Sequence, residues 1–288
     1  MKKFLELLNK KGIKYLIQDN KITVDGNLNL RNIGIKALPE NLSINGDLIL
    51  THTKIETLPE NFSVSGDLDL RNTEIKTIPE KVLIGGSLHL ANTEIKALPK
   101  NFSISGSLNL ANTEIIVLPE SLFVKGDLNL TMTKIKALPE NLFIGSSLYL
   151  GFTEIEALPE NFSIKGNLDL KYSKIKILPE NLSIEGSLNI ESTRIRKLPD
   201  NLSVGAGLYL DIDKIQNIAY RKSCEDNPQT IFACWVNNGF TIQMNDFFGT
   251  FQEFENMVDE KYSGEIAIEY KKLASTCIKE LTEKLKIL

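Results

Sequence analysis

The side chains that could do chemistry are few in this chain, and they are scattered. His52 and His89 are the two histidines, and Asp69 lies between them. Two histidines without a third strong ligand make a weak case for a metal site. The sequence holds no Gly-rich phosphate loop, no Ser-His-Asp arrangement and no Cys/His spacing of a zinc site. We therefore expect no metal, no cofactor and no catalytic residues.

A different chemistry, recognition through apolar contact, is indicated by aromatic residues that recur at a spacing of twenty. Met132, Phe152 and Tyr172 fill three successive places of a column that is mostly asparagine elsewhere. We expect one apolar patch on a polar surface, a common anchor of protein interfaces. Its predicted members are Met132, Tyr149, Phe152, Tyr172, Tyr209 and Ile212. Two interpretations stay open: the patch binds a partner, or it consists of tolerated substitutions or packs against the carboxy-terminal segment.

These residues are positioned by a twenty-residue repeat. Lined up from Gly26, ten copies follow without insertion or deletion. A Leu-x-Leu pair opens each copy and predicts a short strand, since alternation is the period of a strand. Proline in each copy leaves no room for a long helix, so the return side is expected to be extended. The inward positions of one copy are Leu48, Leu50, Ile55, Leu58, Phe62 and Val64.

Two further columns predict how each coil turns. A hydroxyl column stands where the chain leaves the strand, and we expect it to satisfy backbone groups withdrawn from the sheet. It consists of Thr53, Thr73, Thr93, Thr113, Thr133, Thr153, Ser173 and Thr193. A glycine column opens the coils and predicts a backbone angle that other residues avoid. It consists of Gly26, Gly46, Gly66, Gly86, Gly106, Gly126, Gly166 and Gly186.

A second candidate surface lies on the return side. The outward position there is usually serine, but it becomes Leu83, Phe123 and Phe143 in three copies. Phe123 and Phe143 belong to adjacent copies. Exposed apolar side chains of this kind can mediate self-association, and the alternative is a plainly exposed or partly covered pair.

The segments outside the repeats are predicted to be caps, because the end coils of a solenoid would otherwise expose apolar surface and strand edges. We expect domains at 1–25, 26–218 and 219–288. The first should hold a helix over 2–11 and strands over 13–18 and 21–24. The last should form a small α+β lobe with a hairpin over 230–244, turning at Asn237-Asn238-Gly239, and helices over 250–262 and 265–285. The apolar side of the final helix is predicted to be Ile268, Leu273, Cys277, Ile278, Leu281 and Leu285.

The composition of the chain limits the classes of partner that it is expected to bind. The chain has 288 residues, 42% of them hydrophobic, and a formal net charge of -4 with acids and bases interspersed. This charge pattern disfavours nucleic acid and an anionic membrane surface, and no apolar run reaches transmembrane length. The three cysteines, Cys224, Cys234 and Cys277, follow the repeats without the spacing of a disulfide scaffold. We expect a reducing, cytoplasmic setting and a protein partner.

The motif LPENLxxxxxLxLxxTxI resembles a leucine-rich repeat of the short bacterial type, over about residues 26–218. It is similar, more loosely, to twenty-residue-repeat proteins common in bacteriophage and bacterial genomes. The resemblance implies a β-rich solenoid with a curved parallel sheet that binds macromolecules across its concave face. The function we expect is non-catalytic protein binding. Its more specific form is a phage or prophage product that inhibits a host defence protein.

An enzymatic alternative comes from a second resemblance. Bacterial effector ubiquitin ligases pair similar repeats with a catalytic Cys-x-Asp, and here Cys224-Glu225-Asp226 follows the repeats. The resemblance implies a Cys224 thiolate as acyl acceptor with Asp226 as its orienting base. Against it, only about sixty residues follow and strands are predicted next, whereas that family's catalytic domain is a much larger helical fold.

Overall fold

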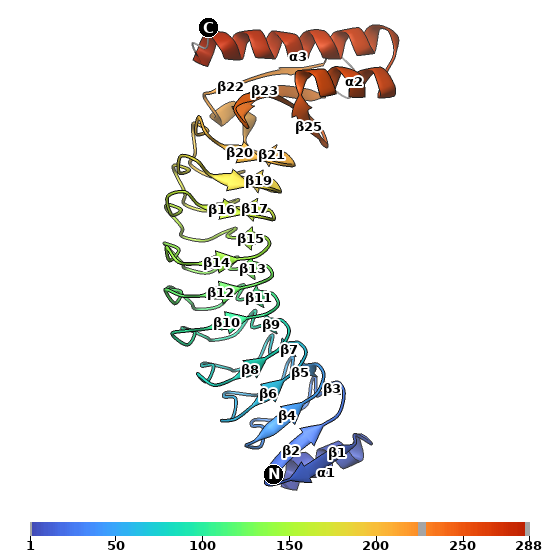
Figure 1. Cartoon of the computed structure of the whole chain (residues 1–288), viewed down its shortest axis with the longest axis vertical. Coiled ribbons are helices and arrows are strands. Elements are labelled where there is room, and N and C mark those ends of the chain that lie inside the picture. The colour runs from blue at the N-terminus through green and yellow to red at the C-terminus, as the bar shows by residue number, and fades with distance from the viewer. Residues whose placement is uncertain (1, 224–228, 286–288) are drawn as a thin grey trace. The chain divides into compact units, whose positions relative to one another are not determined.

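The computed structural model describes residues 2–223 and 229–285. The chain divides into two compact units, Met1–Ile155 and Glu156–Leu288. Figure 1 shows the elements of both units. The domain boundaries expected at 25/26 and 218/219 stay predictions.

The amino-terminal cap contains the elements that the sequence predicts. Helix α1 (Lys2–Lys10) buries Phe4 and Leu8. Gly12, at φ +67°, ends the helix, and Ile13 N–H returns to the carbonyl of Leu8 at 2.9 Å. Strand β1 (Tyr15–Gln18) turns at Asp19 and Asn20 into the antiparallel β2 (Lys21–Val24). Because β2 then pairs in parallel with the first return strand, the cap covers the sheet edge.

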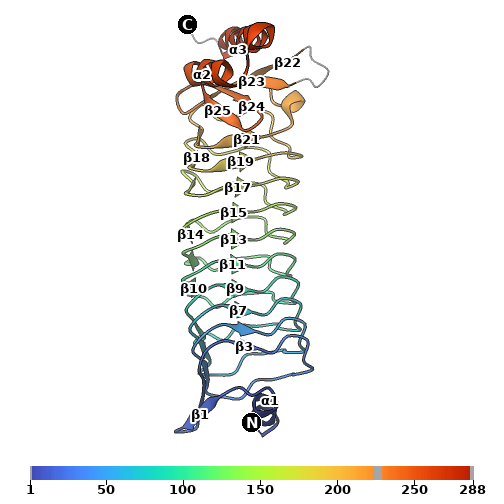
Figure 2. The ribbon, with the colours of Figure 1, turned by 90° about the vertical axis from the view of Figure 1, so that its right-hand side faces the viewer.

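The first unit is a parallel-strand solenoid. Its coils open on the front strands, which pair in register with their neighbours twenty residues away. They are β3 (Leu28–Asn29), β5 (Leu48–Ile49), β7 (Leu68–Asp69), β9 (Leu88–His89), β11 (Leu108–Asn109), β13 (Leu128–Asn129) and β15 (Leu148–Tyr149). Figure 2 shows the front strands stacked in chain order.

The return side of the first unit is also extended, and it forms short strands of its own. They are β4 (Leu42–Ile44), β6 (Ser63–Val64), β8 (Leu83–Ile84), β10 (Ser103–Ile104), β12 (Phe123–Val124) and β14 (Phe143–Ile144). One sheet has the order β1-β2-β4-β6-β8 and another the order β10-β12-β14. Between front and return strands lies the core, in which Leu48, Leu50 and Ile55 are fully buried. The expected β-rich solenoid with a parallel sheet and a helix in its amino-terminal cap is thereby confirmed in this unit.

The glycine column has a different cause from the one that the sequence suggests. Among the described residues of this column, only Gly26 has a positive φ, +85°. The other glycines are needed because the coils approach closely: a Cβ on Gly66 would lie 2.1 Å from Asp47 Oδ1. That oxygen accepts the backbone N–H of Asp67 at 2.8 Å. The same bond recurs between neighbouring coils with Asn, Asp or Ser as acceptor, so glycine makes room for a polar ladder that joins them.

The threonines of the hydroxyl column behave as predicted, whereas Ser173 does not. Each threonine donates to the backbone carbonyl three residues earlier at 2.6 to 2.7 Å, at Thr53, Thr73, Thr93, Thr113, Thr133, Thr153 and Thr193. The Ser173 hydroxyl is buried without a hydrogen-bond partner among the described residues. Serine lacks the methyl group that restricts the threonine rotamer, so its hydroxyl is less firmly directed to the carbonyl.

The second unit begins with more coils of the same kind. Its front strands are β17 (Leu168–Asp169), β19 (Ser187–Asn189) and β21 (Gly207–Tyr209), and its return strands are β16 (Ser163–Ile164), β18 (Ser183–Ile184) and β20 (Ser203–Val204). A 3-10 helix, η1 (Ile212–Lys214), follows the last front strand.

The rest of the second unit is an α+β lobe. An antiparallel sheet has the order β22 (Ile218–Lys222), β23 (Thr230–Val236), β24 (Gly239–Met244) and β25 (Phe247–Thr250). The predicted hairpin is confirmed, and its turn residues are Asn237 and Asn238, both left-handed, with Gly239 already in the strand. Helix α2 (Phe251–Lys261) begins at the capping box of Thr250 and Glu253.

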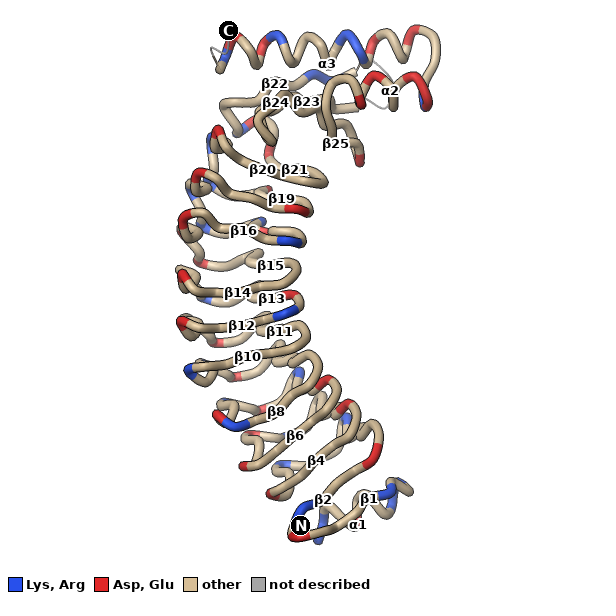
Figure 3. The backbone as a smooth tube through the Cα atoms, in the orientation of Figure 1, with Lys and Arg blue, Asp and Glu red and all other residues tan. Residues whose placement is uncertain are grey.

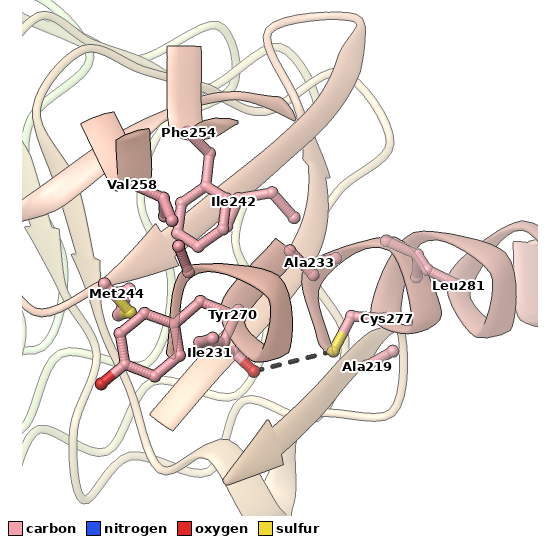
Figure 4. Close-up of a cluster of buried hydrophobic side chains, with 12 residues drawn as sticks. Ala219, Ile231, Ala233, Ile242, Met244, Phe254, Val258, Tyr270, Cys277 and Leu281 are labelled. Carbon is pink, nitrogen blue, oxygen red and sulfur yellow. Dashed lines mark hydrogen bonds between the residues drawn. The ribbon is translucent and has the colours of Figure 1, made fainter. Parts of the chain in front are cut away.

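Helix α3 (Gly264–Leu285) packs on the sheet through a face that differs in part from the predicted one. The buried side chains are Ala267, Tyr270, Ala274, Cys277 and Leu281 (Figure 4). Ile268, predicted to be on this face, is 68% exposed, and Leu273 and Ile278 are only partly buried. A prediction from large apolar residues alone misplaced the contact face, because the buried face also includes the small residues Ala267 and Ala274.

The lobe attaches to the last coil by imitating another coil. Asn237 N–H donates to the carbonyl of Leu202 at 2.9 Å. The Asn237 side chain accepts from Val204 N–H at 2.9 Å and donates to Val204 O at 2.8 Å. On the front strand, Gln243 Oε1 accepts the Leu208 N–H at 2.8 Å. These bonds satisfy backbone groups that a further coil would otherwise pair.

Replacement of Gly66 by alanine should lower the free energy of unfolding by about 1–3 kcal/mol, because the new methyl group displaces the inter-coil polar ladder. Gly34→Ala is the matched control, since a Cβ at Gly34 meets nothing within 4 Å. Urea unfolding of both variants measures the difference. Equal stability of the two would show that close approach is not the reason for this glycine.

Replacement of Asn237 by glycine should keep the turn, because glycine accepts its left-handed backbone, but should lose the side-chain bonds to Ser203 and Val204. We expect a loss of about 1–3 kcal/mol and faster hydrogen exchange at the Val204 amide. Asn238→Gly is the control, since Asn238 has the same backbone, at φ +57°. Equal behaviour of the two variants would contradict this docking role.

Candidate functional site

The predicted patch residues occupy an unusual backbone position. Two residues after the second front leucine, the chain is left-handed, with φ between +53° and +62°. The residues are Asn32, His52, Asn72, Asn92, Asn112, Met132, Phe152, Tyr172 and Ser192. Asparagine tolerates this conformation better than other residues with a Cβ, which explains its frequency in the column. Large apolar residues are therefore placed here against the local backbone preference.

Asparagines in the first unit also form a ladder. Asn92 Nδ2 donates to Asn72 Oδ1 at 3.1 Å, and Asn112 Nδ2 donates to Asn92 Oδ1 at 2.8 Å. The next coil has Met132, which cannot continue this pattern. The column therefore changes at Met132 from hydrogen-bonded amides to apolar side chains.

Met132 and Phe152 lie on neighbouring coils of the first unit. Their front strands, β13 and β15, pair in register, and Met132 N–H donates to the carbonyl of Gly151 at 2.9 Å. Met132 is 57% exposed and Phe152 is 50% exposed. Tyr149 is half-buried in β15, opposite Asn129. We call Met132, Tyr149 and Phe152 the apolar column.

The second unit holds the other predicted patch residues. Tyr172, at φ +58°, and Tyr209 have exposed side chains, whereas Ile212 is half-buried. Ile212 does not share the left-handed backbone of the column, because it begins the 3-10 helix η1. The expected extension of the apolar column to Tyr172, Tyr209 and Ile212 stays a prediction.

The return surface divides into two parts. Phe123 and Phe143 stack with ring centroids 4.5 Å apart and an angle of 5° between their planes. Leu83 is exposed but belongs to the other return sheet, and the coil of Ser103 separates it from the phenylalanine pair. Self-association through this surface stays a prediction.

One exposed apolar pair was missed by sequence reasoning. Ile116 and Val117 are both exposed and border a groove of about 540 Å³ that Lys134 and Pro139 also line. The signal was available, since neighbouring coils have Lys-Ala or Lys-Thr at these positions. It was overlooked because the two residues follow Ile115 and look like part of the inward pattern.

Of the candidate metal-binding residues, Asp69 is engaged by an arginine. Arg71 donates to both oxygens of Asp69, from Nε at 2.9 Å and from Nη2 at 2.6 Å. Burial by itself would raise the pKa of Asp69, but the hydrogen bonds from Arg71 outweigh it and lower the pKa. The Asp69 carboxylate is therefore paired with the guanidinium of Arg71.

The cysteines of the described lobe are buried free thiols. Cys234 and Cys277 have no exposed area, and Cys277 Sγ donates to the carbonyl of Ile231 at 3.7 Å. Burial raises the pKa of Cys234 to about 12 and that of Cys277 to about 11. Neither thiol is suited to nucleophilic chemistry. Cys224, Glu225 and Asp226 lie outside the described residues.

Replacement of Phe152 by asparagine tests whether this side chain serves folding. The variant relieves left-handed strain and removes only half-exposed apolar surface, so the free energy of unfolding should change by less than about 1 kcal/mol. Phe62→Ala, at a buried position, should cost about 3–5 kcal/mol. Thermal and urea unfolding measure both. A loss above about 2 kcal/mol for Phe152→Asn would assign Phe152 to the packing of the solenoid.

Comparison with known proteins adds a structural likeness. The solved structure of YopM from Yersinia enterocolitica WA-314 matches with a TM-score of 0.33 and 18% sequence identity. The match covers 64% of this chain and 55% of the YopM chain, so it spans little more than half of that protein. No protein-family model matches the chain, and no curated protein matches it. None of the described helices is long and apolar enough to cross a membrane.

Proposed function

We propose that the chain is a non-catalytic module that binds a protein partner through the apolar column. The observation that carries this proposal is the exposure of Met132 and Phe152 at left-handed backbone positions. A non-glycine residue in this conformation costs roughly 1–2 kcal/mol, and asparagine is the residue that reduces the cost. Met132 and Phe152 neither suit the left-handed backbone nor fill the core, so their proposed role is contact with a partner.

The chemistry of the apolar column suits a protein surface. A thioether and two aromatic rings offer adaptable apolar contact, and the hydroxyl of Tyr149 adds a polar group at its edge. Such residues anchor interfaces when they are surrounded by polar side chains. In the first unit the surroundings are the Asn92 and Asn112 amides on one side of Met132. Tyr172 and Tyr209, which are exposed in the second unit, are proposed as further contacts of a partner.

The more specific form of the proposal is that the partner is a host protein and the chain is a phage or prophage product that inhibits it. The resemblance of the repeats to those common in bacteriophage and bacterial genomes supports this form. The free thiols Cys234 and Cys277 suit a reducing compartment such as the cytoplasm. An effector-type ligase remains the alternative from another class, with Cys224 as its nucleophile.

The double substitution Met132→Asn with Phe152→Asn tests the proposal. The partner is first captured from host extract by the wild-type chain and identified, and its purified form is then titrated by calorimetry. We expect the double variant to bind about 100-fold or more weakly, since hot-spot residues contribute roughly 2 kcal/mol or more each. Its unfolding transition should stay that of the wild type.

Two controls separate the alternatives. Phe123→Ser with Phe143→Ser restores the serine of other coils on the return side and should leave the affinity unchanged. Cys224→Ala should also bind normally if the chain is a binding module, and ubiquitin discharge that depends on Cys224 would favour the ligase. Unchanged affinity of the Met132 and Phe152 double variant would exclude the apolar column as the binding site.

A further inference from the structure

The first three coils carry a second feature, apart from the apolar column. A pocket of about 240 Å³ opens on the front side there. Its lining is polar and charged, with Ile49 as the one large apolar member, and consists of Asn29, Arg31, Ile49, Thr51, His52, Asp69, Arg71 and Asn72. We propose that this pocket binds the carboxylate of a glutamate or aspartate side chain presented by a protein partner.

The pocket exists because a short side chain stands between two long ones. Arg31, Thr51 and Arg71 occupy the same place in three successive coils. Two coil spacings put the backbones of the two arginines roughly 10 Å apart, a gap that one carboxylate can bridge with charge-assisted bonds of about 2.8 Å to each guanidinium. Thr51 forms the wall between them.

Arg71 is held in place and keeps donors for a ligand. Its Nε and Nη2 each donate one hydrogen bond to Asp69, which is 8% exposed. A guanidinium has five N–H donors, so three remain for a second acceptor. Because Asp69 fixes the orientation of the guanidinium, less conformational entropy is lost when a ligand binds.

The ion pair of Asp69 and Arg71 is not needed for the turn of the coil to form. In other coils the residue at the Asp69 position accepts the backbone N–H two residues later, and Asn29, Asn109, Asn129 and Asn189 all do so with an amide oxygen. Asp69 makes the same bond to Arg71 N–H at 3.1 Å. The negative charge and its arginine partner are therefore additions to a turn that works without them.

Unsatisfied donors at the pocket favour an oxygen ligand. The Thr51 hydroxyl is buried and has no hydrogen-bond partner among the described residues. Asn72 accepts from Asn92 through Oδ1, which leaves its amide nitrogen as a donor at the rim. A buried hydroxyl without a partner is unfavourable, and a ligand oxygen that reaches it after a rotamer change would remove this penalty.

Charge selects a monoanion. The two arginines and the one aspartate of the lining leave a formal excess of one positive charge, on a chain whose net charge is -4. Acidic and basic residues are both present along the coils of the first unit (Figure 3). A carboxylate neutralises the excess, whereas a phosphate dianion would leave the site with one net negative charge and costs more to remove from water. An acidic side chain is therefore favoured over a free phosphate.

Arginine side-chain NMR of the full chain tests this site. The Nε resonance of Arg71 is followed during titration with N-acetyl-glutamate amide, with N-acetyl-glutamine amide as the uncharged control and inorganic phosphate as the competing anion. We expect a saturable shift with the glutamate probe, on the order of millimolar affinity, and none with the glutamine probe. Binding of phosphate should be at least about tenfold weaker.

Variants locate the binding. Arg31→Gln removes an exposed charge without touching the Asp69 and Arg71 pair, and it should weaken glutamate binding about tenfold. Lys171→Gln is the matched control, because Lys171 makes the equivalent pair with Asp169, at 3.6 Å, in the second unit. The proposal is overturned if the Arg71 resonance does not saturate, if Arg31→Gln binds like the wild type, or if phosphate binds as tightly as the glutamate probe.

Discussion

Lateral hydrogen bonding between coils is the constraint on which this molecule depends. Each front strand is only two or three residues long, so no strand pair is stable alone, and the backbone groups of one coil are satisfied by the next. This requires coils of constant length and a close approach at every opening turn. The unbroken twenty-residue period, the glycine column and the side-chain ladder of Asn27, Asp47 and Asp67 all follow from it.

Lateral hydrogen bonding between coils also determines which positions of a coil are free to carry recognition residues. Inward positions are occupied by the core, and the turn threonines are committed to backbone carbonyls. The outward front positions and the left-handed position after them remain variable. In the first unit they carry an asparagine ladder, an apolar column at Met132 and Phe152, and a charged pocket at Arg31 and Arg71. One scaffold thus presents different chemistry at different coils without a change of backbone.

Much of the fold could be predicted from the sequence, because its signals are local and repeated. Strand alternation, the helix start near Thr250 and the hairpin over Thr230–Val236 and Gly239–Met244 each depend on a few neighbouring residues. The errors arose where the reason lies in tertiary packing. Most of the column glycines are explained by an oxygen of the preceding coil. The buried face of α3 includes the small residues Ala267 and Ala274, which a pattern of large apolar residues does not reveal.

The sequence allowed the residues of the candidate site to be predicted, but not the backbone conformation that makes them unusual. Departures from the asparagine column identified Met132 and Phe152, yet only the backbone reveals that the column is left-handed. The charged pocket escaped notice because Arg31, Thr51 and Arg71 look unremarkable as single letters. Their significance depends on the short side chain between two long ones and on the bidentate contact of Arg71 with Asp69.

The manner in which the lobe meets the last coil also bears on how such a chain can evolve. Asn237 and Gln243 bind backbone groups of Leu202, Val204 and Leu208, which every coil offers. The one coil side chain that Asn237 bonds is the Ser203 hydroxyl, and serine is the usual residue at that position of the coils. The lobe can therefore bind the last coil whatever the number of coils before it. One coil of twenty residues is encoded by sixty nucleotides. Duplication or deletion in steps of that length can therefore lengthen or shorten the solenoid while the carboxy-terminal lobe stays unchanged.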